Sequence, residues 1–292
     1  MLNRRSFLQF AATLPLFALS SRAFAQSPDD AATQLAKLEA SFGARLGLFA
    51  FNTGSGAQIS YRADERFPLL STFKVMAAAA VLKRSEREPN LLQQRIRYNK
   101  SNLVTYSPIT EKHLTNGMTV AQLCAAALQY SDNTAGNLLI RLIGGPKALT
   151  KFARATGNNK FRLDRWETDL NTAIPNDPRD TATPEAMARS LRNFTLGNAL
   201  SSASRAQLIE WLVGNTTGDK RIRAAVPPRW RVGDKTGSGD YGTANDIAVI
   251  WPPNRAPIVL AIYTTHNRAD AKRSDELIVE AARIALAGLD AR

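Results

Sequence analysis

The order of strand-like and helix-like segments most restricts how this chain can fold. Two β-rich runs near its start, residues 45–53 and 58–62, are joined by Gly54-Ser55-Gly56, a spacing typical of a β-hairpin. Three further strand-like runs lie near its end, at residues 230–235, 243–251 and 258–265. Helical spacing of apolar residues covers 71–83, 120–130, 133–143, 147–156, 184–195, 203–213 and 271–287. Strands from both ends of the chain must therefore meet in space if they share one sheet.

This order predicts an α+β architecture. The terminal strands are expected to pair into one five-stranded antiparallel sheet flanked by helices, built from residues 26–70 and 214–292. Residues 71–213 are expected to form an inserted all-helical subdomain, with a long aperiodic loop at about 162–183. With 44% hydrophobic residues among 292, the chain can bury sizeable cores. Its single cysteine, Cys124, excludes an intrachain disulfide.

The first 25 residues have the pattern of an export signal rather than of a folded element. Arg4 and Arg5 precede an apolar stretch from Phe7 to Leu19, and Ala23-Phe24-Ala25 matches a small-x-small cleavage site. The arginine pair favours twin-arginine export, with a Sec signal as the alternative. The apolar stretch is shorter than the roughly 20 residues of a membrane-spanning helix. We therefore expect cleavage after residue 25, a periplasmic or secreted protein, and no membrane anchor in the mature chain.

The formal net charge of +13 is compatible with several classes of partner, because basic proteins include nucleic-acid binders and ordinary soluble enzymes. Loss of Arg4, Arg5 and Arg22 with the signal lowers the charge to +10, and the remaining bases are dispersed. Solvated surfaces explain them better than a nucleic-acid patch. His113 and His266 lie far apart without a second His or a Cys nearby, which argues against a transition-metal site. We expect a monomer without nucleic-acid partner, metal or organic cofactor.

Three short motifs carry residues suited to acyl transfer. Ser71-Thr72-Phe73-Lys74 places a hydroxyl and an amine at i and i+3 on one helix face, where the amine can take the serine proton. Alone, this motif is expected by chance about once in such a chain, so an N-cap serine and a solvated lysine explain it equally well. Ser131-Asp132-Asn133 and Lys235-Thr236-Gly237 follow in order, and the joint pattern is rare by chance. The set resembles the serine penicillin-recognising enzymes, which include β-lactamases and penicillin-binding proteins.

The long loop distinguishes a hydrolase from a transpeptidase within that superfamily. Its segment Arg165-Trp166-Glu167-Thr168-Asp169-Leu170-Asn171 is similar to the Glu-x-x-x-Asn of the class A omega loop. A carboxylate and an amide four residues apart can hold one water, with the carboxylate as base and the amide as guide. Arg165 and Asp180 resemble the ion pair that closes the neck of this loop. The chain as a whole resembles a class A serine β-lactamase.

Other segments extend this resemblance over nearly the whole mature chain. They are residues 106–113 (YSPITEKH), 215–218 (NTTG) and 234–246 (DKTGSGDYGTAND). The last segment is most similar to the cefotaxime-hydrolysing branch of class A. In this family His113 is expected to be structural.

The resemblance implies a role for each motif residue. Ser71 is the nucleophile, its proton is taken by Lys74 or by Glu167 through water, and both alternatives stay open. Ser131 passes a proton to the leaving lactam nitrogen, and Glu167 with Asn171 directs water onto the acyl-enzyme. The backbone N–H groups of Ser71 and Ser238 are expected to form the oxyanion hole. The remaining substrate-binding residues implied are Tyr106 as cleft wall, Asn133 for the side-chain amide, and Lys235, Thr236, Gly237, Ser238 and Arg221 for the substrate carboxylate.

Two positions depart from the family pattern. Ala78 stands where many class A enzymes place the disulfide partner of Cys124, so that bond cannot form. Ala244 replaces a base often found on the strand after Lys-Thr-Gly. Arg221 stands where other members place an alternative arginine, which implies that it supplies the missing positive charge; a surface arginine is the other interpretation.

The function implied is hydrolysis of the β-lactam amide of penicillins and cephalosporins through a serine acyl-enzyme, which confers antibiotic resistance. Two alternatives share the three motifs, a penicillin-binding peptidase and a non-catalytic β-lactam sensor domain. A peptidase would lack Glu167 and Asn171, and a sensor usually carries a membrane segment.

Overall fold

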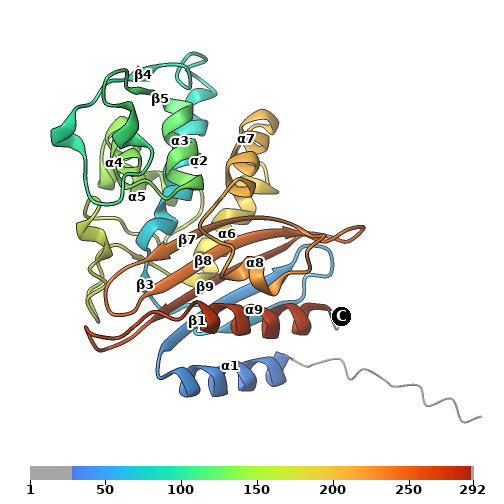
Figure 1. The fold of residues 1–292 in the computed structure, drawn as a ribbon. Coiled ribbons are helices and arrows are strands. Elements are labelled where there is room, and N and C mark those ends of the chain that lie inside the picture. The colour runs from blue at the N-terminus through green and yellow to red at the C-terminus, as the bar shows by residue number, and fades with distance from the viewer. Residues whose placement is uncertain (1–27, 291–292) are drawn as a thin grey trace, which may run out of the picture.

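A five-stranded antiparallel sheet forms the centre of the protein. The computed structural model describes residues 28–290, and Figure 1 shows the sheet with helices on both faces. The strand order is β2-β1-β9-β8-β7, so strands from the two ends of the chain lie side by side. The strands are β1 Arg45–Asn52, β2 Gln58–Tyr61, β7 Arg231–Ser238, β8 Ala244–Trp251 and β9 Ile258–Thr265. The predicted α+β architecture is confirmed.

Successive side chains of the central strands belong alternately to two hydrophobic cores, one on each face of the sheet. In β1, Leu46 and Leu48 belong to one core and Phe49 and Phe51 to the other. Successive side chains of a strand point to opposite faces, so a strand buried on both sides contributes to two cores.

One face of the sheet is covered by the helices from the two ends of the described chain and by one short helix that precedes β7. They are α1 Pro28–Phe42, α8 Ile222–Ala225 and α9 Asp275–Asp290 (Figure 1). Helix α1 is not among the predicted helices. Helix α9 begins four residues later than the predicted start at residue 271, because the Ser274 hydroxyl accepts a hydrogen bond from the Leu277 N–H and caps the helix.

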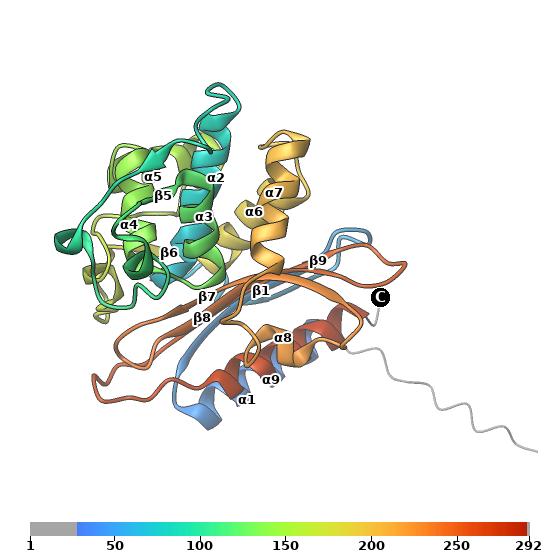
Figure 2. The ribbon, with the colours of Figure 1, turned by 45° about the horizontal axis from the view of Figure 1, so that its top comes forward.

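The other face carries the remaining helices, which extend away from the sheet (Figure 2). They are α2 Phe73–Ser85, α3 Val120–Gln129, α4 Asn133–Leu142, α5 Pro146–Ala155, α6 Pro184–Thr195 and α7 Ser202–Val213. Helices α6 and α7 pack directly on the sheet. The subdomain boundaries at residues 70 and 213 stay a prediction.

Short elements order the connections around the helices. Strand β3 (Phe67–Pro68) pairs with β6 (Thr181–Ala182), and β4 (Arg95–Ile96) pairs with β5 (Met118–Thr119). The long loop contains a 3₁₀ turn at Asp169–Asn171 and ends in β6, which attaches it beside the sheet.

The predicted export signal, residues 1–25, lies outside the described residues. Within residues 28–290, no helix is both long and apolar enough to cross a bilayer. The same residues contain no cluster of three or more His, Cys, Asp or Glu side chains arranged to hold a metal ion.

Candidate active site

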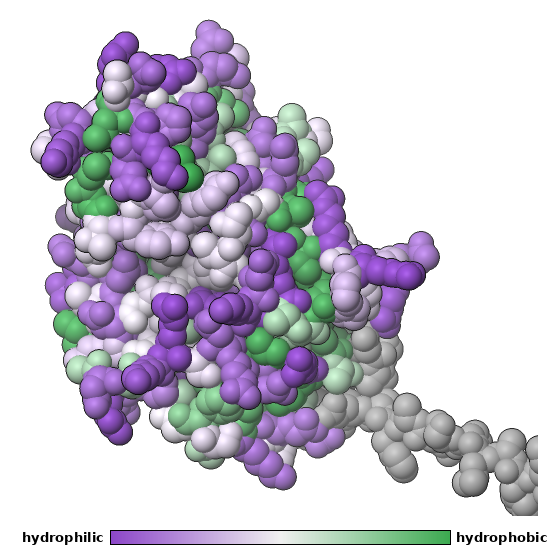
Figure 3. Space-filling model, viewed as in Figure 1, coloured by the Kyte–Doolittle hydropathy of each residue, from purple (hydrophilic) through white to green (hydrophobic). Residues whose placement is uncertain are grey.

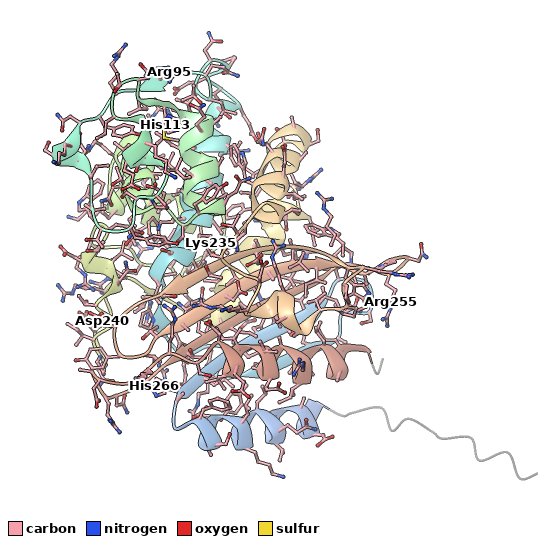
Figure 4. All side chains as sticks on the ribbon, viewed as in Figure 1. Arg95, His113, Lys235, Asp240, Arg255 and His266 are labelled. Atoms are coloured by element: carbon pink, nitrogen blue, oxygen red, sulfur yellow. The ribbon has the colours of Figure 1, made fainter. Side chains whose placement is uncertain are left out.

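The predicted site residues gather around a cleft of about 520 Å³ between the sheet and the helical part. Nine of them line its wall: Ser71, Tyr106, Ser131, Asn133, Asn171, Arg221, Thr236, Gly237 and Ser238. The other three, Lys74, Glu167 and Lys235, are buried directly behind this wall. Lys235 lies where the sheet meets the helices (Figure 4). Three motifs and the loop, far apart in sequence, thus form one site.

Ser71 lies in a 3₁₀ turn, Leu70–Thr72, that continues directly into α2. This turn replaces the predicted α-helical start and keeps Ser71 and Lys74 on one side. The Lys74 ammonium donates to Ser71 Oγ over 2.8 Å, and it lies 2.9 Å from Glu167 Oε1. It also donates to Asn133 Oδ1 over 2.7 Å. Lys74 is therefore held against the hydroxyl that it would activate.

The Lys74 ammonium is fully buried. Burial lowers the pKa of Lys74, and the charge of Glu167 acts in the opposite direction. A lowered pKa makes the neutral amine more accessible, which is what a general base requires. Glu167 Oε1 lies 3.4 Å from Ser71 Oγ, so a second base also lies near the hydroxyl.

Asp132 fixes the loop that carries Ser131 and Asn133. Its carboxylate caps α4 by accepting from the Ala135 N–H, and it also accepts from the N–H groups of Ile109 and Thr110. Ser131 adopts a φ of 57°, in the left-handed region. This strained residue is held by the surrounding bonds, an arrangement typical of functional sites.

Strand β7 brings Lys235 to the opposite side of Ser131. The Lys235 ammonium donates to Ser131 Oγ over 2.9 Å. Burial lowers the pKa of Lys235 well below its usual value, and the charge of Lys74 adds to this effect. Lys235 therefore binds the hydroxyl of Ser131, while Lys74 binds the backbone carbonyl of the same residue.

Gly237 allows β7 to lie close to the nucleophile turn. A Cβ atom at this position would lie 2.9 Å from Leu70 Cβ and 3.3 Å from the Ser71 nitrogen. Any larger residue would therefore push the strand away from Ser71. Ser238 is the next residue of β7, so this close approach keeps the two predicted oxyanion-hole residues on adjoining segments.

The guanidinium of Arg221 donates most of its hydrogen bonds to acceptors within the protein. Its Nη1 donates to the carbonyls of Gly237 and Asn245, its Nε to Asp275 Oδ1, and its Nη2 to Ser238 Oγ over 2.7 Å. A guanidinium has five N–H donors, so one remains. The residue is only 4% exposed, which excludes the interpretation as a surface arginine.

Several contacts fix Glu167 within the loop. Arg165 Nε donates to Asp180 Oδ2 over 2.5 Å, so the predicted ion pair at the loop neck is present. Asn137 brackets Glu167: its Nδ2 donates to the Glu167 carbonyl, and its Oδ1 accepts from the Glu167 N–H, each over 2.9 Å. Asn171 Nδ2 donates to Glu167 Oε2 over 2.5 Å.

The predicted site residues omit Asn137 and six residues that line the cleft, which are Thr216, Thr217, Asp219, Lys220, Arg273 and Asp275. Asn137 holds Glu167, Asp275 pairs with Arg221, and Thr217 Oγ1 lies 2.6 Å from Thr236 Oγ1. Thr217 is part of the segment 215–218 that resembles the family, so a signal for it exists. Nothing in the local pattern around Asn137 or Asp275 distinguishes them from ordinary helix residues.

The fold and the cleft together define a serine enzyme of the penicillin-recognising type. The model of the β-lactamase enzyme family matches residues 30–289. Beta-lactamase Toho-1 of Escherichia coli is 58% identical over 285 residues, 98% of each chain. The carbapenem-hydrolyzing beta-lactamase KPC of Klebsiella oxytoca is 56% identical, over 99% of this chain and 98% of its own.

A solved structure agrees with these relatives. The β-lactamase from Desulfarculus baarsii DSM 2075 superposes with a TM-score of 0.87 at 55% identity, covering 88% of this chain and 96% of that one. The chain belongs to the β-lactamase enzyme family.

Proposed function

We propose that this β-lactamase opens penicillins and cephalosporins through an acyl-enzyme on Ser71, which an activated water then hydrolyses. In the first step Ser71 Oγ attacks the lactam carbonyl. Its proton passes to Lys74, 2.8 Å away, or towards Glu167, 3.4 Å away. The backbone N–H groups of Ser71 and Ser238 stabilise the oxyanion.

Ser131 delivers the proton to the lactam nitrogen as the ring opens. Its Oγ accepts from Lys235, so its own hydrogen is available to donate. Lys235 can then return a proton to Ser131 over their hydrogen bond, and its lowered pKa supports that transfer.

The hydroxyls of Ser238 and Thr236 bind the substrate carboxylate. Ser238 Oγ accepts from Arg221, which leaves the serine hydrogen free to donate into the cleft. Arg221 therefore acts mainly through Ser238, and its buried charge favours an anionic ligand. Asn133 contacts the side-chain amide, and Tyr106, 57% exposed, forms the outer wall.

Hydrolysis of the acyl-enzyme depends on Glu167 and Asn171, and this arrangement carries the proposal. Asn171 donates to Glu167 Oε2, while its own buried Oδ1 accepts no hydrogen bond within the described residues. A base and an unpartnered acceptor therefore lie together beside Ser71. A water held between them would be deprotonated by Glu167 and aimed at the ester.

Intact-protein mass spectrometry after mixing with a penicillin tests the proposal. The native protein should return rapidly to its unmodified mass. The Glu167→Ala variant should retain an adduct on Ser71, and the matched Asp169→Asn variant, an exposed carboxylate of the same loop, should behave as native. Rapid turnover by Glu167→Ala would exclude this assignment, and a persistent adduct on the native protein would indicate a peptidase or sensor.

We also propose that residues 1–25 direct export to the periplasm or the medium and that the mature protein is monomeric. The arginine pair Arg4-Arg5 and the Ala23-Phe24-Ala25 site support this. Replacing both arginines by lysine should stop twin-arginine export, and normal export of that variant would point to a Sec signal. Analytical ultracentrifugation should give one species of monomer mass.

A further inference from the structure

Residues 87–160 carry many exposed lysine and arginine side chains and few acidic ones. Residues 87–160 contain three acids, Glu88, Glu111 and Asp132. The same segment contains ten exposed bases: Arg87, Arg95, Arg97, Lys100, Lys112, Arg141, Lys147, Lys151, Arg154 and Lys160. Asp132 is fully buried, so it does not offset the surface charge. The helical part therefore has a strongly positive surface.

None of these ten bases forms an ion pair within residues 28–290. On three other helices, bases pair with acids one turn away: Arg84 with Glu88 in and after α2, Arg189 with Glu185 in α6, and Arg283 with Glu280 in α9. Such i,i+3 and i,i+4 pairs neutralise a solvated helix face. Helix α5, with the sequence PKALTKFARA, contains three bases and no acid.

The three bases of α5 form one row, which we call the cationic face: Lys147, Lys151 and Arg154. Their spacing of i, i+4 and i+7 places them on one side of the helix, along about 10 Å. The opposite side is fully used in packing, since Leu149 and Ala153 are completely buried and Phe152 stacks on Phe194. The outward side of the helix therefore presents mainly charged side chains.

We propose that the cationic face of α5 docks the protein on the surface of an anionic lipid bilayer. A bilayer presents negative headgroups throughout its plane, which suits a straight row of bases without a groove. Sequence-independent binding of single-stranded nucleic acid normally adds stacking aromatic side chains to the basic ones. The exposed large aromatics of the described chain are Tyr106, Tyr130 and Trp166, and none lies on α5.

The geometry makes this a peripheral, reversible contact. Arg95, another of the ten unpaired bases, lies at the top of the helical part in Figure 4, where many hydrophilic residues are exposed in Figure 3. Because no large apolar side chain is exposed on α5, the contact should be electrostatic and sensitive to salt. Because α5 contributes no residue to the wall of the catalytic cleft, docking and hydrolysis should be separable.

Co-sedimentation with vesicles tests the proposal. The purified protein should bind vesicles of mixed phosphatidylglycerol and phosphatidylcholine, release them at high salt, and not bind phosphatidylcholine alone. Since each base near an anionic surface strengthens binding about fivefold, the Lys147→Gln/Lys151→Gln/Arg154→Gln variant should lose on the order of a hundredfold in partition coefficient. The single Lys151→Gln variant should lose about fivefold.

A matched triple variant separates position from net charge. Arg189→Gln/Arg268→Gln/Arg283→Gln removes the same number of charges from bases that are ion-paired. It should bind vesicles nearly as the native protein does, and both triples should hydrolyse a penicillin normally. Equal loss of binding in both triples, binding that resists salt, or binding to a DNA duplex but not to anionic vesicles would overturn the proposal.

Discussion

The ammonium nitrogen of Lys74 lies 2.9 Å from Oε1 of Glu167, and both side chains are completely buried. Each charge is removed from water, so each depends on the other and on the surrounding hydrogen bonds. Lys74 also donates to the Ser131 carbonyl over 2.9 Å, which connects the pair to the second motif. The two candidate bases are therefore parts of one electrostatic unit.

Lys74→Met should destabilise the protein by about 3–5 kcal/mol, because it leaves the buried carboxylate of Glu167 without its cation. Urea unfolding would measure this loss, and stopped-flow kinetics should show slower acylation. The double variant Lys74→Met/Glu167→Gln should recover part of the stability, since neither charge then remains. A double variant that is less stable than the single variant would contradict this account.

Asn171→Ala should slow hydrolysis of the acyl-enzyme by on the order of a hundredfold. The hydrolytic water and the carboxylate of Glu167 each lose a contact with Asn171 that positions them. Single-turnover kinetics should show this loss in deacylation with acylation largely retained. Asn176→Gly is a suitable control in the same loop, since Asn176 is exposed and its φ of 64° suits glycine. Equal slowing of both steps would indicate general loop damage.

Asp180→Asn should loosen the loop that carries Glu167. Asp180 accepts from Arg165 Nε and from the N–H groups of Asp164 and Arg165. The loss of stability should be about 2 kcal/mol, as charged hydrogen bonds are weakened. Asp177→Asn is the control, because it breaks an ion pair with Arg179, whose side chain is 46% exposed. This variant should lower the free energy of unfolding by about 0.5 kcal/mol or less. Thermal unfolding distinguishes the two, and equal losses would show that the neck pair has no special role.

The stability of the protein should depend on pH through Asp246. Burial raises the pKa of this carboxyl well above its usual value, and the nearby charge of Asp234 adds to the effect. The folded protein then holds a proton that the unfolded chain releases above about pH 3.9. The stabilisation that this bound proton gives to the folded protein is complete below that pH. It is lost as the pH rises through the folded-state pKa of Asp246.

Asp246→Asn removes this titration while keeping an acceptor for the Ile222 N–H. The native protein should therefore lose stability relative to the variant as the pH rises above about 3.9. Urea unfolding at a series of pH values measures the difference. A difference that does not change with pH would show that Asp246 is ionised in the folded state.

Much of the strand content was predictable, because buried strands are marked by continuous β-branched and aromatic runs. The sequence also contains a signal for α1 that the prediction omits: Ala31, Leu35, Leu38 and Phe42 recur with helical spacing. The end of β7 was underestimated, because Gly237 and Ser238 have low strand propensity. Their pairing with Asn245 and Ala244 keeps them in the sheet.

The sequence by itself determined the reactive groups, since hydroxyl, amine, carboxylate and amide are fixed by residue type and by short motifs. Only the tertiary structure placed Glu167 beside Lys74, committed most of Arg221 to the protein, and made Asn137 the support of the loop. Distances and burial decide those properties, because both the pKa of a group and its free hydrogen-bond donors depend on neighbours from distant segments. The uneven surface charge follows the same rule, since whether a base is neutralised depends on which acid lies beside it in space.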